Sequence, residues 1–174
     1  TPKPSSAASD VYKRQLYHNI ENISYRRCGT MIEIKHEAPS VVDYRNLRKV
    51  AGLSEKSQKA AEKGISNACF NVTIYHGTDL IGMGRVIGDG GTAFQIIDIA
   101  VNPEFQGQGY GKTIMSHIMS YVENEAEEGT YVSLMADYPA DQLYAQYGFI
   151  TTEPHSCGTV SYTHLRAHET GRNL

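Results

Sequence analysis

The sequence predicts an α+β fold, in which a single domain contains one mixed β-sheet. The first observation is a β-rich region over residues 68–101, where turn residues at 76–79 (HGTD) and 88–91 (GDGG) separate three apolar runs. Turns this short join neighbouring antiparallel strands, so the region is expected to be an antiparallel meander. The second observation is that helical apolar spacing flanks this meander, with no internal repeat or low-complexity linker to divide the chain.

One strand and two helices are expected before the meander. Residues 31–36 (MIEIKH) alternate apolar and polar side chains, as a first strand would. Ser40 is a candidate N-cap for a helix whose apolar spacing continues to Gly52. A second, shorter helix is expected over residues 54–64 (SEKSQKAAEKG), which begin with serine and end with glycine.

The elements after the meander begin with a long helix over residues 109–127. Its apolar residues form one stripe, which is more typical of a core-facing helix than of a cofactor site. A strand over residues 130–136 (TYVSLMA), a short helix over 140–148 (ADQLYAQYG) and a strand that opens with Phe149 follow.

The two ends of the chain differ from its middle. Residues 4–15 and 160–174 lack apolar periodicity and resemble translated adapter sequence. We therefore expect residues 1–30 to be a non-native, disordered leader and 159–174 a non-native tail, with Met31 as the natural start. A native disordered arm is the alternative for the leader.

The segment 31–158 is then the folded domain, and it is acidic. It contains 9 Lys+Arg and 16 Asp+Glu, a net charge of −7, whereas the whole chain carries −3. This balance argues against nucleic acid as a partner and mildly favours a cationic one such as an amine. Solubility explains the same charge equally well.

Composition excludes several other classes of protein. No apolar run reaches the roughly 18 residues of a membrane helix, and no secretory signal is expected, because the N-terminal residues of this sequence lack an apolar core segment. The three cysteines show no CxxC spacing, which favours a reducing, cytoplasmic setting. His36, His76 and His155 share no ligand spacing, so no metal site is expected.

A glycine-rich stretch at residues 101–112 (VNPEFQGQGYGK) follows the last strand of the meander and is typical of a phosphate-binding loop. The Walker A pattern fails because its first glycine would have to occupy position 106, which is Gln106. The dinucleotide pattern fails because its third glycine would fall at Lys112 or Ile114.

The pattern that remains is [QR]-x-x-G-x-[GA], formed by Gln106, Gly109 and Gly111 at a helix N-terminus. Glycines let backbone N–H groups approach a pyrophosphate, whose charge the helix dipole favours. A glycine-rich turn that binds no ligand is the alternative interpretation.

Residues 99–112 (IAVNPEFQGQGYGK) resemble the acetyl-CoA-binding signature of the GNAT superfamily of N-acetyltransferases. Residues 143–149 (LYAQYGF) resemble the late motif of the same family, in which a tyrosine precedes a Gly-Phe pair. The two motifs occur in the family's order and at its usual separation, and the resemblance covers roughly residues 31–158. It implies a GNAT-like fold with a splayed mixed sheet and a central helix that binds pyrophosphate.

The resemblance also assigns roles to individual residues. The pantetheine arm of acetyl-CoA would pair with the backbone of Ile99, Ala100 and Val101. Tyr144 matches the tyrosine that protonates the departing thiolate in many relatives, although aromatic packing is the alternative role. The pyrophosphate would lie on the backbone of the loop and first helical turn: Gln106, Gly107, Gln108, Gly109, Tyr110, Gly111 and Lys112.

No general base is assigned by the sequence. The strand position that holds a carboxylate or histidine in some relatives is Gln95 here, which cannot act as a base but can orient a water. Asp98 is ionisable, yet strand alternation predicts that it lies on the opposite face from Gln95 and Ile97. A structural role for Asp98 is therefore favoured, and a water relay is the default base. A backbone N–H of the strand would stabilise the oxyanion.

These observations predict an enzyme that transfers an acetyl group from acetyl-CoA to a primary amine by direct attack in a ternary complex. The acceptor would be a small-molecule or peptide amine, with a cationic one slightly favoured, and a homodimer is left open. The alternative is a non-catalytic acyl-CoA sensor. The family's last strand would fall at about residues 158–165, where adapter-like sequence begins.

Overall fold

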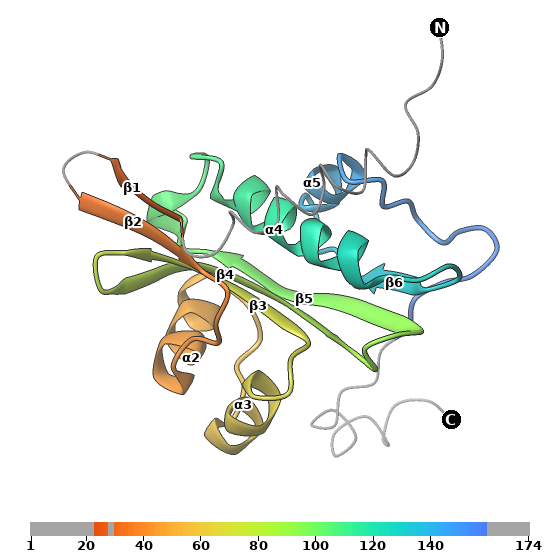
Figure 1. The fold of residues 1–174 in the computed structure, drawn as a ribbon, viewed down its shortest axis with the longest axis horizontal. Coiled ribbons are helices and arrows are strands. Elements are labelled where there is room, and N and C mark those ends of the chain that lie inside the picture. The colour runs from red at the N-terminus through yellow and green to blue at the C-terminus, as the bar shows by residue number, and fades with distance from the viewer. Residues whose placement is uncertain (1–22, 28–29, 160–174) are drawn as a thin grey trace, which may run out of the picture.

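A computed structural model describes residues 23–27 and 30–159 of the chain. Its centre is a six-stranded sheet in which the spatial order of the strands follows the sequence (Figure 1). Every neighbouring pair is antiparallel except β5 and β6, which are parallel. The strands are β1 (Ile23–Arg27), β2 (Thr30–Lys35), β3 (Phe70–His76), β4 (Asp79–Gly88), β5 (Ala93–Val101) and β6 (Tyr131–Leu134). The mixed sheet and the antiparallel meander are therefore confirmed.

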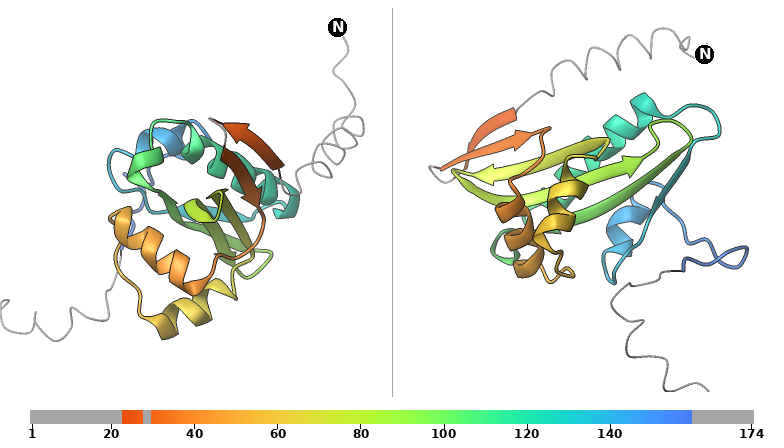
Figure 2. Two further views of the ribbon diagram at one scale, coloured as in Figure 1. Left: turned by 90° about the vertical axis from the view of Figure 1, so that its left-hand side faces the viewer. Right: turned by 90° about the horizontal axis from the view of Figure 1, so that it is seen from below.

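Helices cover both faces of this sheet (Figures 1 and 2). One face carries α2 (Val41–Val50) and α3 (Gln58–Ile65), and the other carries α4 (Tyr110–Glu125), which α5 (Asp141–Ala145) contacts. The short helix η1 (Pro103–Phe105) joins β5 to the glycine-rich loop. The predicted N-cap of the first helix is confirmed, because the Ser40 hydroxyl accepts a 3.0 Å hydrogen bond from the Asp43 N–H.

Each face of the sheet has its own apolar core. On the α4 face, Ile114 and Ile118 pack directly over Gly84 of β4, where a Cβ atom would lie 2.6 Å from Ile114 and 2.9 Å from Ile118. The smaller core beneath α2 and α3 includes Tyr44 and Leu47, each 2% exposed. The sheet is thus packed between two layers of helices. A ligand can reach the sheet backbone where β5 continues beyond its pairing with β6.

The start of one predicted helix and the existence of one predicted strand differ from the structure. The second helix begins after Ser57, whose hydroxyl accepts from the Ala60 N–H, and not after Ser54. The reason is that the Ser54 oxygens accept hydrogen bonds from Arg48 and hold the preceding loop. The predicted strand at Phe149 is wrong: within the described part of the chain, residues 149–159 form no strand. Pro154 interrupts this segment, and proline cannot donate to a ladder.

The prediction of a disordered leader at residues 1–30 falls mostly outside the described residues, since residues 1–22, 28 and 29 are not among them. Ile23–Arg27 form β1, which pairs with β2, so this part is ordered backbone. The predicted tail beyond residue 159, including most of the family's last strand, also lies outside the described residues. No helix in the described ranges is long and apolar enough to cross a membrane.

Candidate active site

The glycine-rich loop presents a continuous run of free backbone donors. Within residues 30–159, the six N–H groups from Gly107 to Lys112 donate to no protein acceptor. The N-cap of α4 is Gly109, which has no side chain to satisfy the first turn of the helix. An anion is the natural partner for such a run of donors at the positive end of a helix.

Backbone geometry explains two of the glycines in this loop. Gly107 has a φ of +72° and Gly109 a φ of +92°, values that side chains other than glycine adopt rarely. A Cβ atom at either position would meet nothing within 4 Å. The glycines are therefore required for the left-handed turns that aim the N–H groups outward, and not to relieve crowding inside the protein.

Strand β5 has an open edge next to this loop. It pairs with β6 only from Ala93 to Ile96, because β6 ends at Leu134, the partner of Ile96. The N–H of Asn102 donates to the Ile81 carbonyl of β4 at 2.8 Å, so antiparallel alternation directs the backbone groups of Ile99 and Val101 away from β4. The open edge leads straight to the free donors of the loop.

This geometry separates the three strand residues expected to contact the pantetheine arm. Ile99 and Val101 present their backbone groups at the open edge, whereas Ala100 directs its own toward Met83 of β4. The Val101 carbonyl already accepts a 3.0 Å hydrogen bond from the Gln106 side chain. Gln106 therefore ties the loop to the strand, while the Lys112 side chain is exposed at the start of α4.

Tyr144 lies on α5, with its ring buried in the core under α4, and the preceding residue Leu143 lies next to Gly111 of the glycine-rich loop. It is 8% exposed, and its hydroxyl makes no hydrogen bond to the described residues. That oxygen is not fully buried, so it keeps contact with solvent. Burial, and then the nearby Asp137 carboxylate, raise the pKa of the Tyr144 phenol. The phenol is therefore protonated at neutral pH and free to donate.

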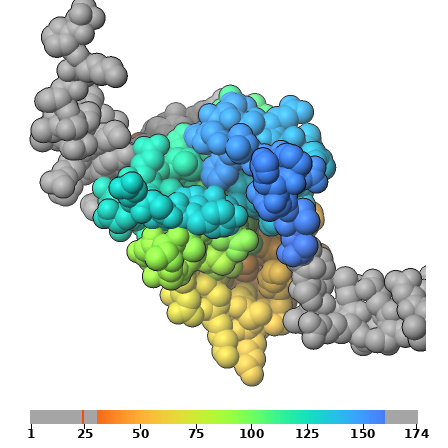
Figure 3. All heavy atoms as spheres, turned by 90° about the vertical axis from the view of Figure 1, so that its right-hand side faces the viewer, coloured from red at the N-terminus to blue at the C-terminus, as the bar shows by residue number. Residues whose placement is uncertain are grey.

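Figure 3 shows the end of the molecule with the β4–β5 turn, opposite to the glycine-rich loop, where the C-terminal described residues in blue lie beside the α4 and β6 segments in teal. Helix α5 is held against α4 by Tyr147, whose hydroxyl donates to the Lys112 carbonyl at 2.8 Å and lies 3.0 Å from the Ser116 hydroxyl. The tyrosine motif and the glycine motif, 32 positions apart between Lys112 and Tyr144, are thus joined in one site.

Gln95 lies on the other side of the sheet. Its neighbours Phe94 and Ile96 are buried in the α4 core, so strand alternation directs Gln95 toward the α2 and α3 face. It is half-buried, and its amide makes no hydrogen bond within the described residues. Gln95 and Tyr144 therefore approach the opening of the sheet from opposite faces.

The predicted face of Asp98 is wrong. Ile97 pairs with Arg85, and Ala100 pairs with Met83. The two β5 residues between these pairs therefore lie opposite the single residue Gly84 of β4. This bulge, centred on Asp98 with a φ of +58°, resets the alternation. Asp98 consequently contacts Tyr44 of α2, on the same face as Arg85 and Ile97.

Three residues around Asp98 were not identified from the sequence as site residues. Tyr44 and Arg48 come from α2, and Arg85 comes from β4. A weak signal exists, because Arg48 falls one turn after Tyr44 on the apolar side of its helix and Arg85 interrupts an apolar strand. Neither position predicts by itself which carboxylate the guanidinium groups will meet.

The histidines occupy separate environments. His76 packs against Phe105 with ring centroids 5.3 Å apart, and His155 is exposed. His36 pairs with His117, a contact that the sequence did not predict. In the part of the chain that the structure describes, no group of three or more His, Cys, Asp and Glu residues is placed to hold a metal ion.

Comparison with known proteins adds independent findings. A family model described as an acetyltransferase (GNAT) domain matches residues 42–160. The uncharacterized N-acetyltransferase ycf52 of Gracilaria tenuistipitata var. liui is 28% identical over 130 residues, which span 71% of this chain and 70% of the relative.

Solved structures share the fold. A probable acetyltransferase from meticillin-resistant Staphylococcus aureus is 56% identical, with a TM-score of 0.73, over 76% of this chain and 100% of that one. N-acetylglutamate synthase from Neisseria gonorrhoeae, solved with coenzyme A and L-arginine, is 20% identical with a TM-score of 0.55. That match covers 79% of this chain and 31% of the synthase, and it supports the fold alone.

Proposed function

The chain belongs to the GNAT acetyltransferase family, and on that premise we propose that it transfers an acetyl group from acetyl-CoA to a primary amine. The observation that carries the proposal is the convergence of three features at one opening. These are the free N–H groups of residues 107–112, the open edge of β5 at Ile99 and the solvent-reaching hydroxyl of Tyr144.

The chemistry of these groups fits acetyl-CoA. A pyrophosphate needs several donors at once, and six successive amides at a helix N-terminus supply them. A pantetheine arm carries amide groups that can pair with the N–H and C=O of Ile99 in the manner of an added strand. Lys112 adds a positive charge beside the same loop. The coenzyme A in the gonococcal synthase structure shows that this fold can hold the molecule in that relative.

The reaction would proceed by direct attack. The neutral amine nitrogen bonds to the thioester carbonyl carbon, the C–S bond breaks and the sulfur leaves as a thiolate. Tyr144 donates its proton to that thiolate, and because the phenolate is the stronger base of the two, it then recovers a proton from water. The proton lost by the amine passes to water, which the amide of Gln95 can orient.

The acceptor is proposed to be a small-molecule or peptide amine. A cationic acceptor is favoured because the segment 31–158 carries a net charge of −7 and because Asp137 lies close enough to Tyr144 to raise the pKa of its phenol. Asp137 would attract a protonated amine toward the site before the amine loses its proton.

The second candidate is an acyl-CoA sensor that binds but does not turn over. It is favoured by one observation: neither Gln95 nor Asp98 is available as a general base. Gln95 has no ionisable group, and three donors surround the Asp98 carboxylate.

Release of free thiol from acetyl-CoA distinguishes the two candidates. The full chain would be incubated with acetyl-CoA and a panel of cationic and neutral primary amines, and product masses would be recorded. An enzyme releases thiol only with an amine that gains an acetyl group, and its double-reciprocal lines intersect because both substrates bind before reaction. Binding of CoA without amine-dependent release by any acceptor would identify the sensor instead.

A further inference from the structure

Asp98 stands at the point where β5 separates from β6. The β5–β6 ladder ends at Ile96, and the bulge follows within two residues. Asp98 is the one residue other than glycine with a positive φ among residues 23–27 and 30–159. Such a conformation persists in a strand only where the surrounding structure imposes it, although Asp tolerates it better than most residues.

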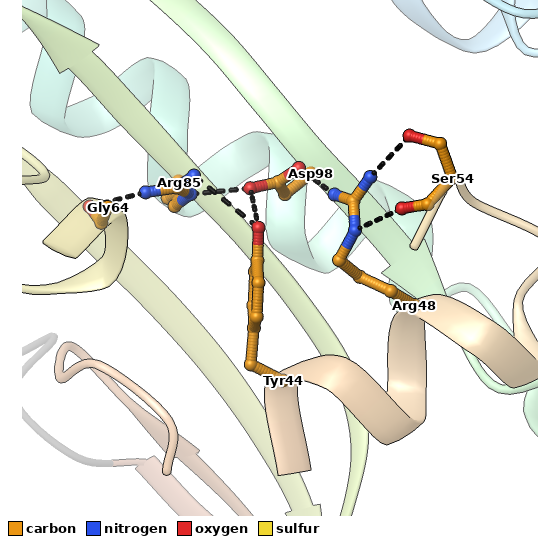
Figure 4. A network of polar contacts seen from close by, with 6 residues as sticks. All are labelled: Tyr44, Arg48, Ser54, Gly64, Arg85 and Asp98. Carbon is orange, nitrogen blue, oxygen red and sulfur yellow. Dashed lines mark hydrogen bonds and ion pairs between the residues drawn. The ribbon is translucent and has the colours of Figure 1, made fainter. Parts of the chain in front are cut away.

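A set of buried side chains imposes it here, and we call the group Tyr44, Arg48, Arg85 and Asp98 the bulge clamp (Figure 4). Arg48 forms an ion pair with one carboxylate oxygen of Asp98. The other oxygen accepts from Arg85 at 2.5 Å and from the Tyr44 hydroxyl at 2.9 Å. The side chains of the two arginines and of Asp98 are between 5% and 13% exposed, so water screens these contacts little.

The clamp connects the bulge to the helices on the far side of the sheet. Arg48 also donates to the Ser54 carbonyl at 2.9 Å and to its hydroxyl at 3.1 Å, in the loop between α2 and α3. Arg85 donates to the Gly64 carbonyl at 2.7 Å, near the end of α3. The position of the bulge is therefore set jointly by both strands, both helices and their connecting loop (Figure 4).

The clamp itself is not a binding site. The cavity beside it has a volume of about 10 Å³ and is lined by Tyr44, Asn71, Arg85 and Asp98, so it has room for one water molecule at most. The clamp matters because it holds the bulge at Asp98 in place. Ile99, whose backbone groups form the open edge, is covalently the next residue after Asp98.

We propose that Asp98 is a positioning residue whose clamp holds the β5 bulge and thereby sets the open edge at Ile99 and Val101 in the geometry that receives an acyl-CoA. This inference rests on the proposed function, because it assigns a role in binding the proposed co-substrate. It also excludes Asp98 as the general base, since its oxygens already accept from three donors.

The test compares CoA affinity with stability in Asp98→Asn and in a matched control. Asparagine also tolerates a positive φ, so this variant removes the carboxylate charge and leaves the backbone preference nearly intact. Ile34→Ala is the control: it empties a buried position in β2, away from the bulge, and lowers stability without touching the clamp. Dissociation constants for CoA would be measured by calorimetry well below each melting temperature.

We expect folded Asp98→Asn to bind CoA at least tenfold more weakly than wild type, while Ile34→Ala binds within twofold of wild type even at a similar or larger loss of melting temperature. Equal weakening in both variants, or unchanged affinity in Asp98→Asn, would overturn the proposal. A fall in turnover with unchanged CoA affinity would also overturn it, and would restore Asp98 as a base.

A second variant covers the case in which Asp98→Asn does not fold. Arg85→Lys keeps the positive charge but cannot reach Asp98 and Gly64 together with the planar guanidinium geometry. We expect it to weaken CoA binding about threefold or more, and affinity equal to wild type would contradict the clamp. If wild type itself binds no CoA, the proposed function fails and this inference fails with it.

Discussion

The Nε2 atom of His36 lies 2.9 Å from the Nδ1 atom of His117, a hydrogen bond between the segment after β2 and the middle of α4. His117 is 9% exposed, and the Phe70 ring packs on His36 with centroids 4.9 Å apart. Burial, and then the charge of His36, lower the pKa of the His117 imidazole to about 4. The pair is therefore stable as neutral rings and is weakened by protonation.

This pair predicts that the protein loses stability in mild acid. Because the pKa of His117 is lower in the folded chain than its ordinary 6.5, the unfolded chain binds more protons between those values. Stability contributed by the neutral ring is complete above pH 6.5 and is lost as pH falls toward about 4, by up to about 3 kcal/mol.

Urea denaturation of wild type and His117→Gln at several pH values between 7.5 and 4.5 measures this. Glutamine cannot titrate, so the difference in unfolding free energy between the two proteins should shrink as pH falls. Parallel curves for the two proteins would show that His117 does not contribute to the acid sensitivity.

Replacement of Gly109 by alanine is expected to weaken CoA binding. The φ of +92° at this position is strained for alanine, so the turn should relax and redirect the N–H groups that follow it. We expect a loss of affinity of about tenfold, which corresponds to about 1.4 kcal/mol. Isothermal titration with CoA measures it.

Gly129→Ala is the matched control for that experiment. Gly129 has a φ of +87°, and a Cβ atom there also meets nothing within 4 Å, but it lies in the turn before β6. The two variants should lose similar stability, about 1 kcal/mol each, while only Gly109→Ala loses CoA affinity. Equal affinities would remove the loop from the binding site.

Removal of the Tyr144 hydroxyl is expected to slow turnover and to leave binding intact. Tyr144→Phe keeps the buried ring in its core position, so the fold and the CoA dissociation constant should be unchanged. Loss of a positioned proton donor typically costs about 10²-fold in rate, and we expect kcat to fall by that amount with KM for acetyl-CoA within a few-fold. The comparison variant is Tyr147→Phe, whose hydroxyl bonds the Lys112 carbonyl. It should reduce kcat by much less, and equal losses would assign Tyr144 a packing role.

A change at Asp137 tests the preference for a cationic acceptor. Asp137 is exposed and lies near Tyr144, so Asp137→Asn should raise KM for a cationic amine about two- to fivefold, as expected for a solvent-screened charge pair. KM for a neutral acceptor and for acetyl-CoA should not change. Glu62→Gln removes the same charge at an exposed position of α3, on the opposite face of the sheet from α5, and serves as control. The same effect from both variants would show that only net charge matters.

Sequence patterns predicted those parts of the fold that depend on neighbouring residues in the chain. The meander follows from short turns between β-rich runs, the start of α2 from the Ser40 cap, and the start of α4 from the run of glycines. Each is a local preference, because capping, turn geometry and side-chain periodicity involve residues only a few positions apart. The glycine and tyrosine motifs were identified by their resemblance to a known family, which requires only short stretches of sequence.

The remaining features were decided by contacts between residues far apart in the chain. Alternation placed Asp98 on the wrong face because a bulge depends on the partner strand and on arginines 50 and 13 positions away. The His36–His117 pair spans 81 positions, and no local pattern predicts it. The ordered β1 strand forms because β2 offers it an edge. Hydrophobic and charge patterns specify which side chains must be buried, and only tertiary packing selects the partners that they meet there.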